Sequence, residues 1–258
     1  MNGPGRNIRK LRTSVDDCLR RVVAWSYGCY VWLVFLALVF TCGGLSILLG
    51  RPSLGRRIAR FGVGLLFRVI GMPLTVAGLD RLPSRPHVLL VNHTSFLDAL
   101  ALIALLPSTP GYAFTTKQQF RSQRMLCPLV RSVGTVVLEN TGVRHGAPNV
   151  ERMAAILRIG INLVVFPEGA FRPEPGLQPF HAGAFVAALR AHAPLVTAGL
   201  RGARTALPLG TWMPRRTAIH LEIGSAFVVP DDADQATIDQ FIAATHHGIA
   251  ALCGESAS

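Results

Sequence analysis

The sequence predicts an α/β fold: a mostly parallel sheet flanked by helices, with an N-terminal membrane-embedded helical segment. Short apolar runs that are typical of buried strands, such as residues 88–91 and 162–166, alternate with helical patterns along most of the chain. This alternation is typical of parallel sheets whose strands are joined by helices. The membrane segment is predicted by residues 22–50, which contain no charged side chain and are longer than an ordinary buried helix.

Composition narrows the class of protein further. The chain has 258 residues, a net charge of +12 and 50% apolar residues, which suits one large domain with an appendage. Eleven of the 26 basic residues fall within the first 70 positions, beside the apolar stretch. This placement favours anionic lipid headgroups as partners. Nucleic acid is not expected as a partner, because no zinc-finger spacing or RNA-binding motif occurs. Five scattered cysteines without a C-x-x-C pair indicate free thiols in a reducing compartment.

The N-terminal part divides into a basic segment at 1–21, a membrane segment at 22–50 and a connecting helix at 51–73. The membrane segment begins with aromatic residues, as at a membrane interface: Trp25, Tyr27, Tyr30 and Trp32. A helix of this length measures about 43 Å, against roughly 30 Å of hydrocarbon. It could be a single tilted span or a re-entrant helix pair broken near Gly43 and Gly44. Basic residues flank both ends, so they do not set an orientation.

The remaining elements follow from apolar periodicity. Residues 57–70 alternate basic and apolar side chains at helical spacing, which suits a helix lying on the membrane or one packed on the core. The globular domain occupies 74–258. Its strands are predicted at 74–77, 88–91, 111–116, 133–138, 162–166, 195–200, 219–223 and 226–229. Its helices are predicted at 99–106, 150–159, 183–189 and 236–253.

Candidate catalytic residues gather where strands end. His93, Lys117, Glu168 and Gly169 each directly follow a predicted strand, and the carboxyl ends of parallel strands share one edge of a sheet. Asp98 lies five positions after His93, a separation of about 140° on a helix. The two can therefore meet only if His93 precedes the helix. Ser95 as N-cap would allow this, but Ser95 and Asp98 also form a capping-box pattern that needs no catalytic role.

The sequence resembles the glycerolipid acyltransferases, the 1-acylglycerol-3-phosphate acyltransferase family with its HX4D motif. Residues 92–98 (NHTSFLD) are similar to the family's NHxSxxD block. Further blocks follow in family order at 134–140 (GTVVLEN), 166–172 (FPEGAFR), 180–185 (FHAGAF) and 193–196 (APLV). Together they span roughly residues 75 to 230.

The resemblance implies an O-acyltransferase in which His93 is the general base and Asp98 orients it. A histidine with a pKa near 6.5 suits proton removal from a hydroxyl at neutral pH. The resemblance also implies that Lys117, Glu168, Gly169 and Arg172 bind the substrate. Ordinary alternatives exist for all four, because Lys117 and Arg172 could be surface residues and Pro-Glu-Gly, which contains Glu168 and Gly169, is common turn chemistry.

The expected reaction moves a fatty acyl group from acyl-CoA or acyl carrier protein to a lysolipid hydroxyl, with no cofactor and no metal. The expected location is the inner (plasma) membrane, with the catalytic domain facing the cytoplasm. The blocks depart from the family at Asn140, where phosphate-using relatives carry arginine, and at Ala170 and His181. Lysophosphatidate and another lysolipid, such as lyso-ornithine lipid, therefore both remain as acceptors. A non-catalytic membrane scaffold is the remaining alternative, since neither G-x-S-x-G nor H-E-x-x-H occurs.

Overall fold

The computed structural model describes residues 4–117, 136–138, 146–170 and 172–256. A seven-stranded sheet lies at its centre, in the order β1-β7-β6-β2-β5-β3-β4. The strands are β1 (Leu74–Ala77), β2 (Val88–Val91), β3 (Tyr112–Lys117), β4 (Val136–Leu138), β5 (Asn162–Val165), β6 (Leu195–Arg201) and β7 (Ile219–Phe227). All neighbouring pairs are parallel except β6 with β7. The predicted α/β class with a mostly parallel sheet is confirmed.

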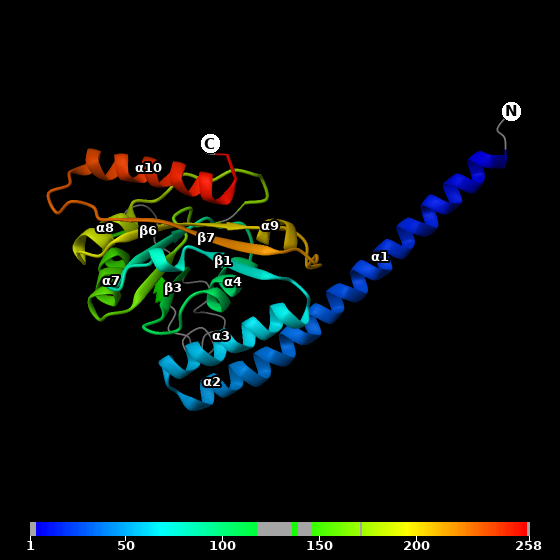
Figure 1. Ribbon diagram of the computed structural model, residues 1–258, viewed down its shortest axis with the longest axis horizontal. Helices are drawn as coiled ribbons and strands as arrows, with labels where there is room; N and C mark the ends of the chain where they lie inside the picture. The colour runs from blue at the N-terminus through cyan, green and yellow to red at the C-terminus, as the bar shows by residue number, and fades with distance from the viewer. Residues whose placement is uncertain (1–3, 118–135, 139–145, 171, 257–258) are drawn as a thin grey trace.

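Helices cover both faces of the sheet (Figure 1). Alternate residues of β2 point to opposite faces, as in any strand. Leu89 and Val91 pack in one apolar cluster with α3 (Pro52–Val69) and α4 (Leu97–Leu105). Val88 and Leu90 pack in a second cluster with α7 (Gly146–Arg158), α8 (Gly183–Arg190) and α10 (Gln235–Cys253). β2 is buried on both sides, so its end is held rigidly.

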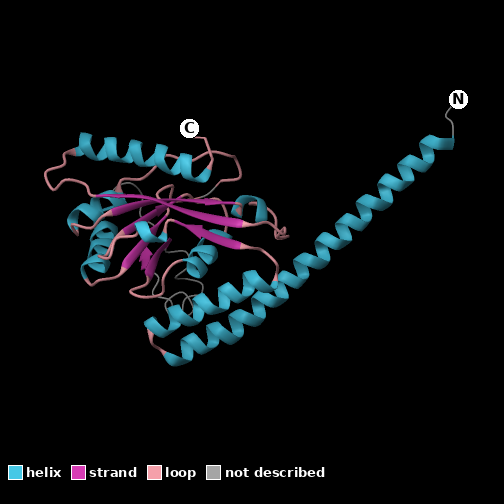
Figure 2. Ribbon diagram, in the orientation of Figure 1, coloured by secondary structure: helices cyan, strands magenta, loops and turns pink. Residues whose placement is uncertain are grey.

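The N-terminal segment is one long helical path that then turns back (Figure 2). α1 (Pro4–Leu38) continues through a π-helical turn, Val39–Gly43, into α2 (Gly44–Leu49). Gly50 ends it in the left-handed conformation, with φ 60°, and α3 returns beside it. The re-entrant alternative placed its break near Gly43 and Gly44, but Gly44 is helical and the reversal comes six residues later, at Gly50.

Among the described residues, one helical stretch, Asp16–Leu49, is long and apolar enough to cross a membrane. α3 has two different faces. Its Leu66 and Phe67 lie in the core, whereas Phe61 is 67% exposed. One face of α3 thus packs on the globular domain. This is the second of the two alternatives from the sequence, a helix packed on the core.

Beyond shifts of helix and strand bounds, two elements differ from the sequence prediction. The strands predicted at 219–223 and 226–229 are one continuous β7, which carries an irregularity opposite Val196 and Ala198. Gly224 lies against Thr197 at this point, where any side chain would collide. A bulge bends the strand here without ending it. The short helix α9 (Ala203–Ala206) was not predicted. Residues 133–135 of another predicted strand lie outside the described residues.

Candidate active site

Asn92 fixes the end of β2. Its side chain is fully buried; Nδ2 donates to the Leu200 carbonyl at 3.0 Å, and Oδ1 accepts from the Leu200 N–H at 2.7 Å. The amide therefore joins the ends of β2 and β6, like an extra rung of the sheet. This anchoring positions the next residue, His93, at the carboxyl edge.

His93 and Asp98 are in contact, as the sequence analysis required. His93 Nδ1 lies 2.8 Å from Asp98 Oδ2, and the Asp98 side chain is wholly buried. The same oxygen accepts from the backbone N–H groups of Thr94 at 2.6 Å and Ser95 at 2.8 Å. Asp98 thus satisfies backbone donors and holds the imidazole, so the two sequence interpretations of this residue are compatible.

Ser95 is not the N-cap of α4. With Ser95 as N-cap, Asp98 would be the third helical residue; in the structure the helix begins at Leu97 with Phe96 as its N-cap, and Asp98 is the second. The Ser95 hydroxyl still accepts from the Leu97 N–H at 3.3 Å, and it donates to the Leu207 carbonyl at 2.8 Å. Ser95 therefore ties the turn to a distant loop while supporting the start of the helix.

The imidazole is oriented on both sides. Since a carboxylate can only accept, Nδ1 carries the proton, and neutral imidazole has its basic lone pair on Nε2. The Phe166 ring stacks on the imidazole, with centroids 4.0 Å apart and planes 16° apart. The His93 side chain remains 18% exposed. A general base needs this combination of fixed tautomer, fixed ring and access.

Glu168 joins the site from the end of β5. Its Oε1 accepts from the backbone N–H of His93 at 2.7 Å, and its Oε2 accepts from the Gln178 N–H at 2.8 Å. The side chain is buried, and burial raises the pKa of the carboxyl above its ordinary value of 4.5. Gly169 follows with φ 70°, and a Cβ here would lie 3.1 Å from the His181 ring. The structure thus brings His93, Asp98, Glu168 and Gly169 together.

The comparisons with known proteins agree with this geometry. The family model described as Acyltransferase matches residues 73–201, half of the chain. This chain belongs to the Acyltransferase family. The matched residues contain β2, β5, the His93–Asp98 pair and Glu168.

Relatives and one solved structure extend the comparison. A 1-acyl-sn-glycerol-3-phosphate acyltransferase of Neisseria gonorrhoeae is 34% identical over 49% of this chain and 51% of its own length. The chain thus spans about half the length of that relative. A 1-acyl-sn-glycerol-3-phosphate acyltransferase of Limnanthes alba is 26% identical over 91% of this chain and 86% of its own length. A lyso-ornithine lipid O-acyltransferase of Pseudomonas aeruginosa is 29% identical over 54% and 51%. The crystal structure of the 1-acyl-sn-glycerophosphate (LPA) acyltransferase, PlsC, from Thermotoga maritima has a TM-score of 0.71 at 18% identity, covering 90% of this chain and 97% of that one; it shows the same fold.

The structure does not bring the two remaining candidates, Lys117 and Arg172, into contact with His93 by any described interaction. Lys117 is the last residue of β3, paired with Leu138 of β4, and its side chain lies outside the described residues. Arg172 is exposed, and its backbone carbonyl accepts from Arg204 Nη1 at 2.9 Å. Asn140 also lies outside the described residues.

An arginine that the sequence analysis missed holds the loop beyond Glu168. Arg204 Nη1 donates to the carbonyls of Arg172, Pro173 and Glu174. Its Nε and Nη2 donate to the two carboxylate oxygens of Glu255, at 3.0 and 2.8 Å. Glu255 in turn accepts from the Gly176 N–H at 2.7 Å. We call these two side chains with residues 172–178 the loop clamp; it ends at Gln178, which donates to Glu168.

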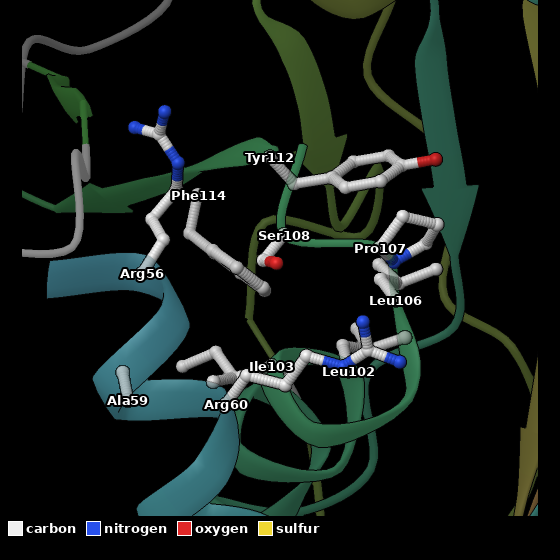
Figure 3. Close-up of a pocket in the computed structure, with 10 residues that line it drawn as sticks. All are labelled: Arg56, Ala59, Arg60, Leu102, Ile103, Leu106, Pro107, Ser108, Tyr112 and Phe114. Carbon is white, nitrogen blue, oxygen red and sulfur yellow. The ribbon is translucent and has the colours of Figure 1, made fainter. Parts of the chain in front are cut away.

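A small cavity of about 30 Å³ lies elsewhere, between α3, α4 and β3 (Figure 3). Arg56 and Arg60 of α3 border it together with Tyr112 and Phe114 of β3. Its α4 residues, Leu102 onward, lie toward the end of the helix away from His93. This cavity is therefore not the site of His93. Within the described part of the chain, no group of three or more histidine, cysteine, aspartate or glutamate side chains could hold a metal ion.

Proposed function

We propose that this protein transfers an acyl group from acyl-CoA or acyl carrier protein to the hydroxyl of a lysolipid, with 1-acylglycerol-3-phosphate as the principal acceptor. The observation that carries the proposal is the contact of His93 with buried Asp98 at the carboxyl edge of the sheet, beside Glu168. The names of the Neisseria and Limnanthes relatives support this acceptor.

The proposed reaction needs one base and no covalent enzyme intermediate. His93 Nε2 takes the proton of the lysolipid hydroxyl as its oxygen attacks the thioester carbonyl. Asp98 stabilises the resulting imidazolium. As the tetrahedral intermediate collapses, the carbon–sulfur bond breaks and the imidazolium returns its proton to the thiolate. The products are the acylated lipid and the thiol, and His93 is neutral again.

Glu168 and Gly169 are proposed to shape the acceptor subsite. Both oxygens of Glu168 already accept one backbone N–H each, but a carboxylate has about four acceptor positions. Glu168 can therefore also accept from a glycerol hydroxyl. Lys117 and Arg172 are proposed as cationic contacts for the acceptor phosphate, because arginine and lysine both bind phosphate.

A lyso-ornithine lipid is the second candidate acceptor. His181 stands where the family pattern has lysine, and the P. aeruginosa relative carries that activity in its name. Fewer cations near the headgroup favour an acceptor with less negative charge.

Membrane attachment is proposed to be one-sided, at the cytoplasmic face of the inner membrane. Tyr27 donates to the Ile70 carbonyl at 2.9 Å, and Trp32 donates to the Trp212 carbonyl at 2.7 Å. Val31, Val34 and Phe35 pack against the core of the globular domain. If residues 22–50 crossed the bilayer upright, these contacts would draw the polar domain into hydrocarbon. A helical hairpin that enters and leaves on one face avoids that cost.

The test is the release of thiol from an acyl thioester in the presence of a panel of lysolipids. His93→Ala should lower turnover about 10²–10⁴-fold, because the general base is removed, while membrane association stays unchanged. His247→Ala, an exposed histidine of α10, is the matched control and should retain full turnover.

Other outcomes would reject the proposal. Near-wild-type turnover by His93→Ala would exclude this residue as the base. Thiol release that needs no lysolipid would indicate a thioesterase, and no release with any acceptor would indicate a scaffold.

A further inference from the structure

The loop between α9 and β7, residues 207–218, exposes apolar side chains that the packing of the fold does not explain. Leu209 is 37% exposed and Trp212 is 70% exposed. A tryptophan is normally buried over most of its surface. Two exposed arginines, Arg215 and Arg216, follow in the same loop. An exposed indole beside arginines is typical of a membrane-water interface.

This loop is attached to α1. Trp32 Nε1 donates to the Trp212 carbonyl at 2.7 Å, and the two indole rings have centroids 6.0 Å apart. Met213 Sδ occupies the space that a Cβ at Gly28 would need. Figure 1 shows the loop reaching from the sheet toward α1. The loop therefore keeps a fixed position relative to the membrane segment.

The position along α1 decides where the loop lies relative to a membrane. Before this point α1 is basic, with Arg20 and Arg21. After it come exposed apolar side chains: Leu33 at 69%, Leu36 at 47% and Phe40 at 72%. Trp25 and Trp32 fall at this boundary, where aromatic residues mark the headgroup region. Trp212, beside Trp32, lies at the same level.

We infer that residues 207–218 form a second membrane contact, in which Trp212 and Leu209 enter the headgroup region of an anionic bilayer and Arg215 and Arg216 meet lipid phosphates. The inference rests on the proposed one-sided membrane attachment and adds a contact made by the globular domain itself. The arginines favour a membrane as the occupant over an apolar protein surface, because anionic headgroups complement them.

This contact would also fix the distance between the candidate active site and the membrane surface. Leu207 begins the loop, and its carbonyl accepts from the hydroxyl of Ser95. Ser95 in turn donates its backbone N–H to Asp98, which holds His93. The loop and the catalytic turn are therefore parts of one hydrogen-bonded unit, and anchoring the first in the interface presents the second to lipid acceptors.

The first experiment uses tryptophan fluorescence, because the chain has only three tryptophans. In Trp25→Phe/Trp32→Phe, Trp212 is the sole reporter, and the contact of Met213 with Gly28 that also attaches the loop to α1 remains. On vesicles of phosphatidylglycerol and phosphatidylethanolamine, lipids brominated near the headgroup end of the acyl chain should quench its emission, and aqueous acrylamide should lose access. The inference would be overturned if, in protein that sediments with the vesicles, acrylamide quenched the Trp212 emission fully and the brominated lipid did not quench it.

The second experiment measures partitioning of the full chain onto the same vesicles. Trp212→Ser should weaken binding roughly tenfold, which corresponds to about 1.4 kcal/mol, and Leu209→Ser should weaken it by a smaller factor. Leu79→Ser is the matched control, since Leu79 is 38% exposed against 37% for Leu209 but lies in the short helix η2 (Leu79–Arg81). Equal binding by all three variants and the wild type would overturn the inference.

The outcomes separate this inference from the proposed function. His93→Ala should bind and be quenched like the wild type, because neither measurement needs turnover. If the chain does not sediment with vesicles at all, both the proposed membrane attachment and this inference are wrong. If Trp212 is shielded from acrylamide only when two copies cross-link, the occupant is a second chain and the inference is overturned.

Discussion

One carboxylate oxygen organises the catalytic turn at the scale of single residues. Asp98 Oδ2 accepts from His93 Nδ1 and from two backbone N–H groups, those of Thr94 and Ser95. Hydrogen bonds to a charged group are about twice as strong as neutral ones. The fold of the turn and the orientation of His93, the proposed base, therefore depend on the same charge.

Asp98→Asn is expected to lower both stability and turnover. An amide oxygen can replace Oδ2 but carries no full charge, so stability should fall by about 1–3 kcal/mol and the imidazolium loses its support. Chemical denaturation and thiol release measure the two effects. In the His93→Ala background the same change should cost stability but no further turnover, because the pair acts as a unit. Independent, multiplicative losses of turnover would contradict a joint role.

Glu168 should make stability depend on pH. Burial raises the pKa of its carboxyl above the ordinary 4.5, so the native state binds the proton more tightly than the unfolded chain. The associated stability is fully present below pH 4.5 and is lost as pH rises through the raised native pKa. The free energy of unfolding of the wild type, minus that of Glu168→Gln, should therefore decrease across this range. A difference that rises with pH would contradict a buried, desolvated carboxylate.

At the scale of elements, the loop clamp connects α9 and the segment after α10 with the loop after β5. Arg204 and Glu255 are 23% and 17% exposed, so their ion pair is largely shielded from solvent. Together they hold three carbonyls and one N–H group of residues 172–178. The clamp positions the backbone of Gln178 against Glu168, so it bears on the proposed acceptor subsite only through other residues.

Arg204→Gln is expected to loosen residues 172–178 without unfolding the domain. Amide hydrogen exchange in this segment should accelerate, and KM for the lysolipid should rise more than kcat falls. Arg190→Gln is a suitable control, because Arg190 is 45% exposed and its ion pair with Glu151 is long, at 3.6 Å. Unchanged exchange in Arg204→Gln would show that the clamp does not hold the loop.

At the scale of the whole molecule, the hairpin of α1–α2 with α3 brings the end of α3 back beside the start of the apolar segment, where Tyr27 and Tyr30 donate to the carbonyls of Ile70 and Val69. Cys18 precedes the apolar segment and Val69 lies at the end of α3, and both are exposed. If attachment is one-sided as proposed, Cys18 alone and Val69→Cys alone, in a background with the other cysteines changed to serine, should react with an impermeant thiol reagent from the same side of sealed vesicles. Labelling from opposite sides would establish a single span.

The sequence predicted much of the architecture, because periodicity and breakers are local. β1 and β2 lie at the predicted positions, and α10 differs by one residue at its start. The differences occur where the hydrogen bonds of the backbone continue through residues that usually end an element. Gly224 and Ser225 suggested a break between strands, but pairing with β6 keeps β7 continuous. Two glycines suggested a break near residue 43, but helix hydrogen bonds continue through a π turn.

The order of strands, helices and motif blocks was determined by the sequence itself, including the apolar segment and the position of His93 at a strand end. Only the tertiary structure decided which side chains meet. Glu168 reaches the His93 backbone across 75 positions, and Trp32 reaches residue 212 across 180. Such contacts depend on how the helices and loops pack on the sheet, and the spacing of side chains along one element does not determine that packing.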